Sequence, residues 1–158
     1  MPEERLILLV DDSSDDRVLL RRAFQKVGVI NPIKEVSSGF EAIQYLEGTG
    51  QFADRTKYPF PGILLLDLNM PHVSGFAVLQ WIRDKMVATP FLVIVLSRLD
   101  EIKNINRAYA LGANSFLTKP GDEKELQALI KSFHDYWVLR NKAPSLEEES
   151  GKSRVDLG

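Results

Sequence analysis

The amino-acid sequence predicts an α/β protein built on a doubly wound, five-stranded parallel sheet. Short runs such as residues 63–66 are apolar at every position, which is typical of strands that helices cover on both faces. Segments with apolar residues three and four apart lie between these runs and predict amphipathic helices. The strand–helix alternation repeats five times, an order that is typical of a parallel sheet in one domain.

The first half of the chain contains three of the expected strands. Ser13 and the acids that follow it suit the start of a helix, and Gly28 suits its end. Gly48 ends a short amphipathic helix, and a long loop with aromatic residues, 48–61, follows. In order, the expected elements are strand 6–10, helix 13–27, strand 33–37, helix 39–47 and strand 63–66.

The second half contains the other two strands and three helices. Pro90 closes the helix before the fourth strand, and Gly112 ends the helix after it. Leu126, Ile130 and Phe133 recur at steps of three and four and place an apolar face on the last helix. In order, the expected elements are helix 74–85, strand 91–96, helix 100–111, strand 114–118 and helix 122–140.

The bulk composition excludes several classes of protein. A net charge of −2 over 158 residues predicts no basic surface for nucleic acid or for an anionic membrane. The absence of cysteine excludes disulfides, thiolate metal sites and a cysteine nucleophile. The short apolar run near the N-terminus ends in two acids, so it suits neither a signal sequence nor a membrane span, and the protein is expected in the cytoplasm.

One domain is expected over residues 1–143. Residues 144–158 are rich in Glu, Ser and Lys with hardly an apolar anchor, and they are expected to form a flexible tail. This length leaves no room for a DNA-binding or catalytic output domain, so the output is expected to be a protein contact.

Polar and charged residues follow four of the expected strands at their carboxyl ends. They are Asp11, Asp12, Asp67, Ser97 and Lys119. In an open α/β sheet the ligand site is the crevice at this edge, so these side chains are expected to converge. Three carboxylates placed together stay ionised only if a cation joins them, and oxygen ligands of this kind select Mg²⁺.

The same residues predict phosphoryl transfer to a carboxylate. Asp67 is the expected nucleophile because it stands alone after the most apolar strand, whereas the adjacent pair Asp11 and Asp12 suits metal binding. Lys119 supplies a cation and Ser97 a hydroxyl donor for the phosphoryl group. Any one of these residues fits a cap or a turn equally well, but the whole set in this order favours the functional interpretation.

Four sequence strings together resemble the receiver domain of two-component response regulators. They are DD at 11–12, LLLDLNMP at 64–71, VLS at 95–97 and GANSFLTKP at 112–120. The resemblance extends over residues 5–140, nearly the whole chain. It implies the CheY-like, (βα)5 flavodoxin-like receiver fold. It also implies a signalling switch, rather than an enzyme, that takes a phosphoryl group from a partner histidine kinase.

Within this family the chain is most similar to stand-alone regulators that work with bacterial and cyanobacterial phytochrome histidine kinases. The shared features are the aromatic loop 48–61, the string at 112–120 and a last helix that ends in Tyr136 and Trp137. The resemblance therefore implies a phytochrome-type kinase as partner, together with a downstream protein that the sequence does not identify.

The resemblance also implies a role for each matching acid. Asp67 is the phospho-acceptor. Asp12 binds Mg²⁺ directly, and Asp11 binds it largely through water. Asn69 binds the metal through its backbone carbonyl.

The remaining matches concern the switch. Ser97 is the hydroxyl that moves towards the phosphoryl group, Lys119 is the counter-ion and Phe116 is the aromatic rotamer switch. The peptide bond between Lys119 and Pro120 is expected to be cis. Arg98 departs from the family pattern, in which a small residue follows the switch hydroxyl. A long cation there is expected to cover the phosphoryl group or to block access to it, which affects the rates and not the chemistry.

Three other functions fit the sequence less well. A phosphatase or phosphotransferase with an aspartyl-phosphate intermediate needs an acid two residues after the nucleophile, and that position is Asn69. A nucleotide-binding domain needs a P-loop or a G-x-G-x-x-G after its first strand, and neither is present. A degenerate receiver that serves only for docking is disfavoured because every acidic position is intact.

The last helix carries more apolar residues than one buried face requires. Phe133, Tyr136, Trp137 and Val138 point around more than half of its circumference. Either the loop 48–61 or the tail covers them, or the same patch on two copies forms a two-fold homodimer. The dimer is the favoured expectation.

Overall fold

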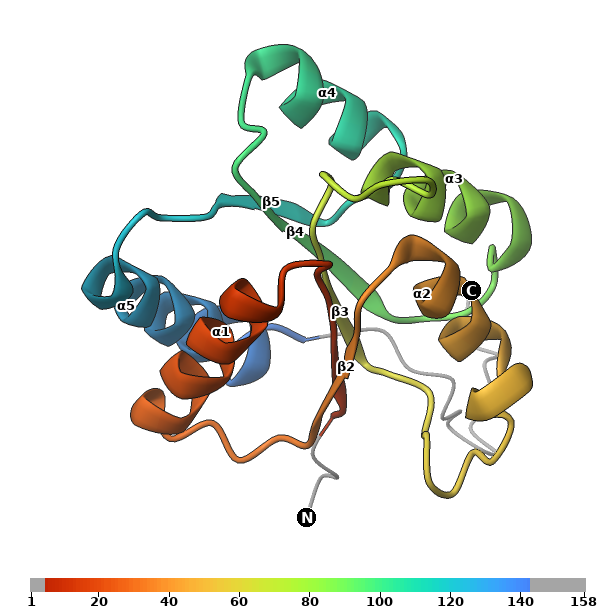
Figure 1. Cartoon of the computed structure of the whole chain (residues 1–158), viewed down its shortest axis with the longest axis horizontal. Helices are drawn as coiled ribbons and strands as arrows, with labels where there is room; N and C mark the ends of the chain where they lie inside the picture. The colour runs from red at the N-terminus through yellow and green to blue at the C-terminus, as the bar shows by residue number, and fades with distance from the viewer. Residues whose placement is uncertain (1–4, 143–158) are drawn as a thin grey trace, which may run out of the picture.

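A computed structural model describes residues 5–142 of the chain. One central sheet has helices on both faces (Figure 1). Its five strands follow the order β2-β1-β3-β4-β5, and every adjacent pair is parallel. The predicted doubly wound α/β fold is confirmed. The strands are β1 (Ile7–Val10), β2 (Ile33–Val36), β3 (Ile63–Leu66), β4 (Leu92–Ser97) and β5 (Ser115–Thr118).

The helices form a layer on each side of the sheet. Two of them, α1 and α5, pack on one face, whereas α2, α3 and α4 pack on the other (Figure 1). The α-helices are α1 (Ser14–Val27), α2 (Gly39–Glu47), α3 (Gly75–Lys85), α4 (Ile102–Ala110) and α5 (Glu123–Phe133). A 3₁₀ helix, η1 (Gly50–Phe52), follows α2, and a π-helical turn, η2 (His134–Val138), follows α5.

Local hydrogen bonds fix the ends of the first helices. The hydroxyl of Ser13 accepts a hydrogen bond from the amide of Asp16 at 3.1 Å and so satisfies a free donor in the first turn of α1. Ser38 and Ser74 cap α2 and α3 in the same way. Gly28 ends α1 with a φ of 85°, a left-handed conformation that favours glycine. The predicted start and end of this helix are therefore confirmed.

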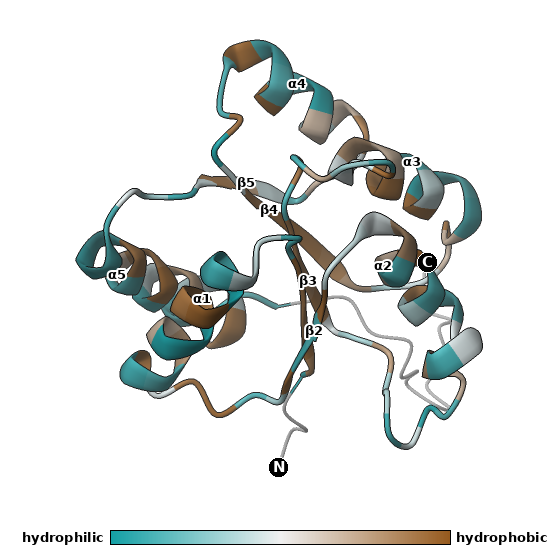
Figure 2. Ribbon diagram, viewed as in Figure 1, coloured by the Kyte–Doolittle hydropathy of each residue, from teal (hydrophilic) through white to brown (hydrophobic). Residues whose placement is uncertain are grey.

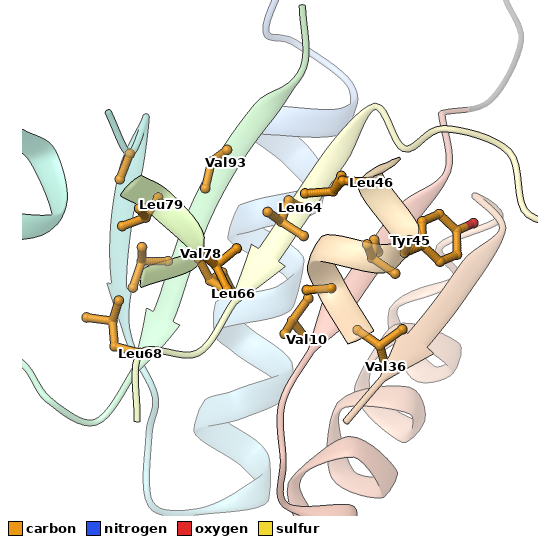
Figure 3. Packing of buried hydrophobic residues seen from close by; sticks show 14 of the residues in the cluster. Val10, Val36, Tyr45, Leu46, Leu64, Leu66, Leu68, Val78, Leu79 and Val93 are labelled. Atoms are coloured by element: carbon orange, nitrogen blue, oxygen red, sulfur yellow. The ribbon is translucent and has the colours of Figure 1, made fainter. Parts of the chain in front are cut away.

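Strands β1 and β3 are apolar at every position because a hydrophobic core lies on each side of them. Val10 and Leu64 point towards α2 and α3, in the cluster that Figure 3 shows. Their neighbours Leu9 and Leu65 point to the opposite face and pack with α1 and α5. Figure 2 accordingly shows central strands in brown between helices that carry both teal and brown.

The loop 48–61 packs on the α2 side of the sheet. The ring of Tyr45 in α2 lies 5.0 Å from that of Phe52 and 5.9 Å from that of Tyr58, measured between centroids. The guanidinium of Arg55 donates hydrogen bonds to the carbonyls of Leu46 and Tyr58 at 2.8 and 3.1 Å. These contacts hold the loop against α2.

The last helix differs from its prediction. The sequence predicts one helix over 122–140, but α5 ends at Phe133 and the chain continues as η2. In this turn the amide of Leu139 donates to the carbonyl of His134 at 3.0 Å, five residues earlier. Amphipathic spacing predicts the helical path but does not distinguish π from α hydrogen bonding.

The described part of the chain bears on two further predictions. Among residues 5–142, no helix has both the length and the hydrophobicity that a bilayer crossing requires. The predicted boundary at residue 143 and the predicted tail 144–158 lie outside the described residues.

Candidate functional site

The carboxyl ends of β1 and β3 place two aspartates side by side. Val10 and Leu66 are paired in register, so Asp11 and Asp67, the next residues, leave adjacent strands at the same level. The amide of Asp67 donates to the carbonyl of Val10 at 3.0 Å, which ties the two strand ends together. Both aspartates are buried, so the two carboxylates share a site with little access to water.

Asp12 completes an acidic cluster at this edge. One carboxylate oxygen from each of Asp11, Asp12 and Asp67 lies within 4.8 Å of the other two. Asp12 is exposed, so solvent reaches the cluster on its side. Carboxylate oxygens this close together suit one hard divalent cation. The residues present therefore fit Mg²⁺.

Lys119, which follows β5, neutralises this cluster from within. Its side chain is 4% exposed, and its Nζ atom lies 2.7 Å from an Asp11 oxygen and 3.4 Å from an Asp67 oxygen. Burial disfavours the charged ammonium, but the nearby carboxylates outweigh this effect and raise the pKa of Lys119. Burial also raises the pKa of Asp11, and Lys119 offsets only part of that increase. The buried ammonium is therefore a fixed counter-charge for the acids.

Asp16, in the first turn of α1, belongs to the same network, although the sequence interpretation missed it. Its Oδ2 atom lies 3.0 Å from Lys119 Nζ and 2.9 Å from Arg98 Nη1. Burial acts to raise the pKa of Asp16, but hydrogen bonds from Arg98 and Lys119 outweigh it and hold that pKa below its ordinary value. A sequence signal was available, because the helix that follows a strand begins at the same sheet edge where the strand ends.

Arg98 lies at the rim of the site. Its guanidinium donates to both oxygens of Asp16, at 2.9 and 3.4 Å, and its side chain is 55% exposed. The hydrogen bond to Asp16 raises the pKa of Arg98 above its ordinary value. In this structure the side chain is bound to Asp16, and the predicted cover over the phosphoryl group stays a prediction.

The predicted switch residues lie on adjacent strands. Ser97 ends β4 and is fully buried, and its hydroxyl accepts a hydrogen bond from the Leu99 amide at 3.2 Å. Phe116 lies on β5 opposite Val95, and its ring is partly buried against the core under α2, α3 and α4. The amide of Phe116 donates to the hydroxyl of Tyr109 in α4 at 3.2 Å. These contacts connect the strand end to the surface formed by α4 and β5.

Two features flank the acids. Asn69 is exposed in the loop after β3, and its backbone amide donates to Asp67 Oδ1 at 3.3 Å.

The peptide bond between Lys119 and Pro120 is trans, since residues 5–142 contain no cis peptide bond. The prediction of a cis bond is therefore wrong, and the trans form is the more stable isomer of most bonds before proline.

The predicted interface residues divide between core and surface. Phe133 is 2% exposed, and its ring packs edge-on against Phe24 of α1 with 6.4 Å between centroids. Its assignment to a surface patch is therefore wrong, because it continues the inner stripe of α5. Trp137 and Val138 are partly buried against the same core, whereas Tyr136 is 54% exposed.

The loop 48–61 does not cover this region. Phe52 and Tyr58 of that loop pack in the core under α2, whereas Trp137 packs in the core under α1 and α5. The two groups therefore lie on opposite faces of the sheet. Tyr136 remains the exposed aromatic residue of η2.

Comparison with known proteins identifies the family. A family model, described as the response regulator receiver domain, matches residues 7–131. The probable methanogenesis regulatory protein FilR2 of Methanothrix harundinacea is 33% identical over 144 residues, which cover 88% of this chain and 87% of that protein. Sequence alone therefore relates nearly the whole chain to a regulator of similar length.

Two solved structures share the fold. The phosphorylated cyanobacterial phytochrome response regulator RcpA matches with a TM-score of 0.82 and 29% identity, over 90% of this chain and 100% of that one. The Mn²⁺-bound form of response regulator Rcp1, a protein of Synechocystis, matches with a TM-score of 0.79 and 26% identity, over 89% of this chain and 99% of that one. By its sequence, its strand order and its relatives, the chain belongs to the response regulator receiver-domain family.

Proposed function

We propose that the protein is a phosphorylation switch in which Asp67 accepts a phosphoryl group from a sensor histidine kinase, with Mg²⁺ as cofactor. The observation that carries this proposal is the buried ammonium of Lys119 between Asp11 and Asp67, beside a cluster of acids that fits a divalent ion. Such a set of charges at the carboxyl edge of a sheet suits a phosphoryl group that is transferred to a carboxylate.

The proposed transfer forms one bond and breaks one bond. A carboxylate oxygen of Asp67 attacks the phosphorus of a phosphohistidine, and the bond from phosphorus to the ring nitrogen breaks. The nitrogen keeps the electron pair, and a proton on the other ring nitrogen makes neutral imidazole the leaving group. The product is an acyl phosphate with more negative charge than the carboxylate. Lys119 Nζ, 3.4 Å from an Asp67 oxygen, is placed to pair with the phosphoryl oxygens.

The acidic cluster is the proposed Mg²⁺ site. Asp12 is exposed, whereas Asp11 is already paired with Lys119, which supports direct ligation by Asp12 and water-mediated ligation by Asp11. A carboxylate oxygen of Asp67 and the backbone carbonyl of Asn69 are the other two proposed protein contacts. When bound, Mg²⁺ screens the charge of the acceptor carboxylate from that of the phosphoryl oxygens. The Mn²⁺-bound structure of Rcp1 supports a divalent ion in a related receiver.

Ser97 and Phe116 are the proposed route from the site to the surface. In the phosphorylated form, the Ser97 hydroxyl leaves the Leu99 amide and binds the phosphoryl group. Phe116 then turns into the space beside Ser97 and changes the surface of α4 and β5. A downstream protein that prefers this surface is the proposed output, and the chain acts as a switch and not as an enzyme.

A phytochrome-type kinase is the proposed phosphodonor. The structural likeness to RcpA, a phytochrome response regulator, supports this partner. FilR2, a probable methanogenesis regulatory protein, is a relative of similar identity, so receivers of this kind serve more than one pathway. The kinase is therefore best identified by direct comparison of donors.

Phosphotransfer from purified kinases tests the proposal. Phosphorylated histidine kinases of the phytochrome type and of an unrelated type are mixed with the protein, and label on the receiver is followed over time. We expect rapid transfer from the phytochrome type and none to Asp67→Asn. Label on Asp67→Asn would contradict the assigned acceptor, and faster transfer from the unrelated kinase would contradict the assigned partner.

A homodimer through η2 is a second proposal, now limited to Tyr136, Trp137 and Val138. The exposure of Tyr136 supports it, and Tyr136→Glu leaves the buried residues in place. Phe40→Glu is the matched control, because Phe40 is 59% exposed on α2, on the other face of the sheet. We expect sedimentation to show dimers for the wild type and for Phe40→Glu but not for Tyr136→Glu. A wild type that stays monomeric at high concentration, phosphorylated or not, would rule the dimer out.

A further inference from the structure

Two cations share one oxygen atom at the rim of the site. Asp16 Oδ2 lies 3.0 Å from the buried Lys119 Nζ and 2.9 Å from Nη1 of Arg98. The same lysine contacts Asp11 at 2.7 Å and Asp67 at 3.4 Å. Asp16 is therefore a competitor of Asp67 for the ammonium, and Arg98 is in turn a competitor of Lys119 for Asp16.

This arrangement has a direct consequence for the phosphoryl group. The group needs Lys119 as a partner, yet the ammonium is closer to an oxygen of Asp16 than to one of Asp67. Asp16 therefore opposes the movement of the lysine towards the acceptor. Because Arg98 draws charge density from the same Asp16 oxygen, it weakens the hold of Asp16 on Lys119.

We propose that Asp16 is a positioning residue that holds Lys119 back from Asp67, and that Arg98 sets the strength of this hold by binding Asp16. The proposal rests on the proposed function, since it concerns how readily Asp67 takes and keeps a phosphoryl group. It also assigns a role to Arg98 that differs from covering the acids: the guanidinium acts through Asp16 and not on the phosphoryl group itself.

Arg98 and Asp16 carry opposite charges, so together they add nothing to the net charge of the site. We therefore expect them to act through the position of Lys119. The net charge of the site is set by the other charged groups, which are Asp11, Asp12, Asp67 and Lys119. Removing Arg98 leaves Asp16 with Lys119 as its remaining cation, so the lysine is held more firmly. Removing Asp16 leaves Arg98 without a means to influence Lys119.

A double-mutant cycle tests this dependence. The rate of phosphorylation by phosphoramidate at saturating Mg²⁺ is measured for the wild type, Arg98→Gln, Asp16→Asn and the double variant. We expect Arg98→Gln to slow the wild type about fivefold, the upper end for a pair at the surface. In the Asp16→Asn background the same change should alter the rate by less than about twofold.

Two further variants separate position from charge. Asp15 is an exposed neighbour in the first turn of α1, so Asp15→Asn makes the same change in charge without touching the pair. Arg98→Gln should still slow this variant about fivefold. Arg98→Lys keeps a cation beside Asp16 and should restore most of the wild-type rate. Equal slowing by Arg98→Gln in the Asp16→Asn and Asp15→Asn backgrounds would overturn the proposal, as would no slowing in the wild type.

A measurement without metal or phosphodonor gives a second readout. Nitrogen-15 NMR follows the exchange of the Lys119 ammonium protons with water. We expect slower exchange in Arg98→Gln, faster exchange in Asp16→Asn and no change in Asp15→Asn. Unchanged exchange of the ammonium protons in Arg98→Gln would contradict the proposed hold of Asp16 on Lys119, even if the phosphorylation rates agree with the proposal.

The outcomes also distinguish this proposal from the one on which it rests. A wild type that phosphoramidate does not label would refute the proposed function, and this inference with it. A wild type that is labelled on Asp67, with an effect of Arg98→Gln that does not depend on Asp16, would refute this inference alone.

Discussion

Gly75, the first residue of α3, touches the backbone of the proposed acceptor, and alanine at this position should disturb the site. A Cβ atom on Gly75 would lie 2.3 Å from the carbonyl oxygen of Asp67 and 2.6 Å from the Cα atom of Leu68. Both neighbours are backbone atoms, so no side-chain rotation relieves the overlap. The Gly75 amide also donates to the Leu68 carbonyl at 3.0 Å, which holds the helix against this loop.

The overlap sets the size of the expected effect. The shorter separation is about 1.1 Å less than an ordinary contact, which begins at 3.4 Å, so the backbone at Asp67 must shift by a similar amount. Overpacking of this kind lowers the free energy of unfolding by about 1–3 kcal/mol. Without an overlap, alanine in a helix would instead raise it by about 0.5–1 kcal/mol relative to glycine. The predicted change in the free energy of unfolding therefore has the opposite sign to the change that helix propensity alone would cause.

Urea unfolding and Mg²⁺ calorimetry measure the two consequences. Gly75→Ala should unfold at lower urea and bind Mg²⁺ about tenfold more weakly, because Asp67 moves with its backbone. Gly121→Ala is the matched control, since a Cβ there meets no atom within 4 Å, and both quantities should stay at wild-type values. Wild-type stability and Mg²⁺ affinity in Gly75→Ala would refute the close packing of α3 on the acceptor.

Three further predictions follow from burial and charge. Burial raises the pKa of Tyr45 to about 12, so the free energy of unfolding should fall by roughly 2 kcal/mol as pH rises from 10 to 12. Tyr45→Phe should remove this dependence on pH, and an unchanged dependence would contradict the raised pKa of Tyr45. Asp12→Ala should weaken Mg²⁺ binding, measured by calorimetry, more than Asp11→Ala, and equal losses would count against the proposed ligand roles. Phe133→Ala should lower stability by about 3–5 kcal/mol in urea unfolding. Tyr136→Ala should change it by less than about 0.5 kcal/mol, and similar losses for both would place Phe133 outside the core.

The sheet was predictable because its strands lie between two cores. Runs such as Ile63–Leu66 are apolar on both faces, and this pattern needs no tertiary information. The fainter strand Ile33–Val36 is at the sheet edge and is only partly buried, which explains its weaker pattern. The π-helical turn His134–Val138 was not predictable, because apolar spacing does not report which carbonyl each amide selects.

The convergence of charged residues was predictable from topology alone. Asp11 and Asp67 directly follow two strands whose ends the sequence locates. These two strands pair in register, so the two aspartates lie side by side. The pairing of Asp16 with Arg98 was not predictable, because it joins residues 82 positions apart through side chains whose directions the sequence does not fix. The burial of Phe133 was indicated by the sequence, because Phe133 shares the apolar face of the last helix with Leu126 and Ile130. The structure adds its contact with Phe24 of α1. The proposed roles of Ser97, Phe116 and Asn69 remain predictions.

Phosphorylation of Asp67 itself is the central claim, and intact-mass spectrometry with a small phosphodonor tests it most directly. With Mg²⁺ and phosphoramidate, the wild type should gain the mass of one phosphoryl group, because Lys119 and the Mg²⁺ held by the acidic cluster would neutralise the charge at Asp67. Chelation of the metal should prevent the gain, and so should Asp67→Asn. Equal labelling of Asp67→Asn, or labelling that is unaffected by the chelator, would contradict a Mg²⁺-assisted transfer to Asp67.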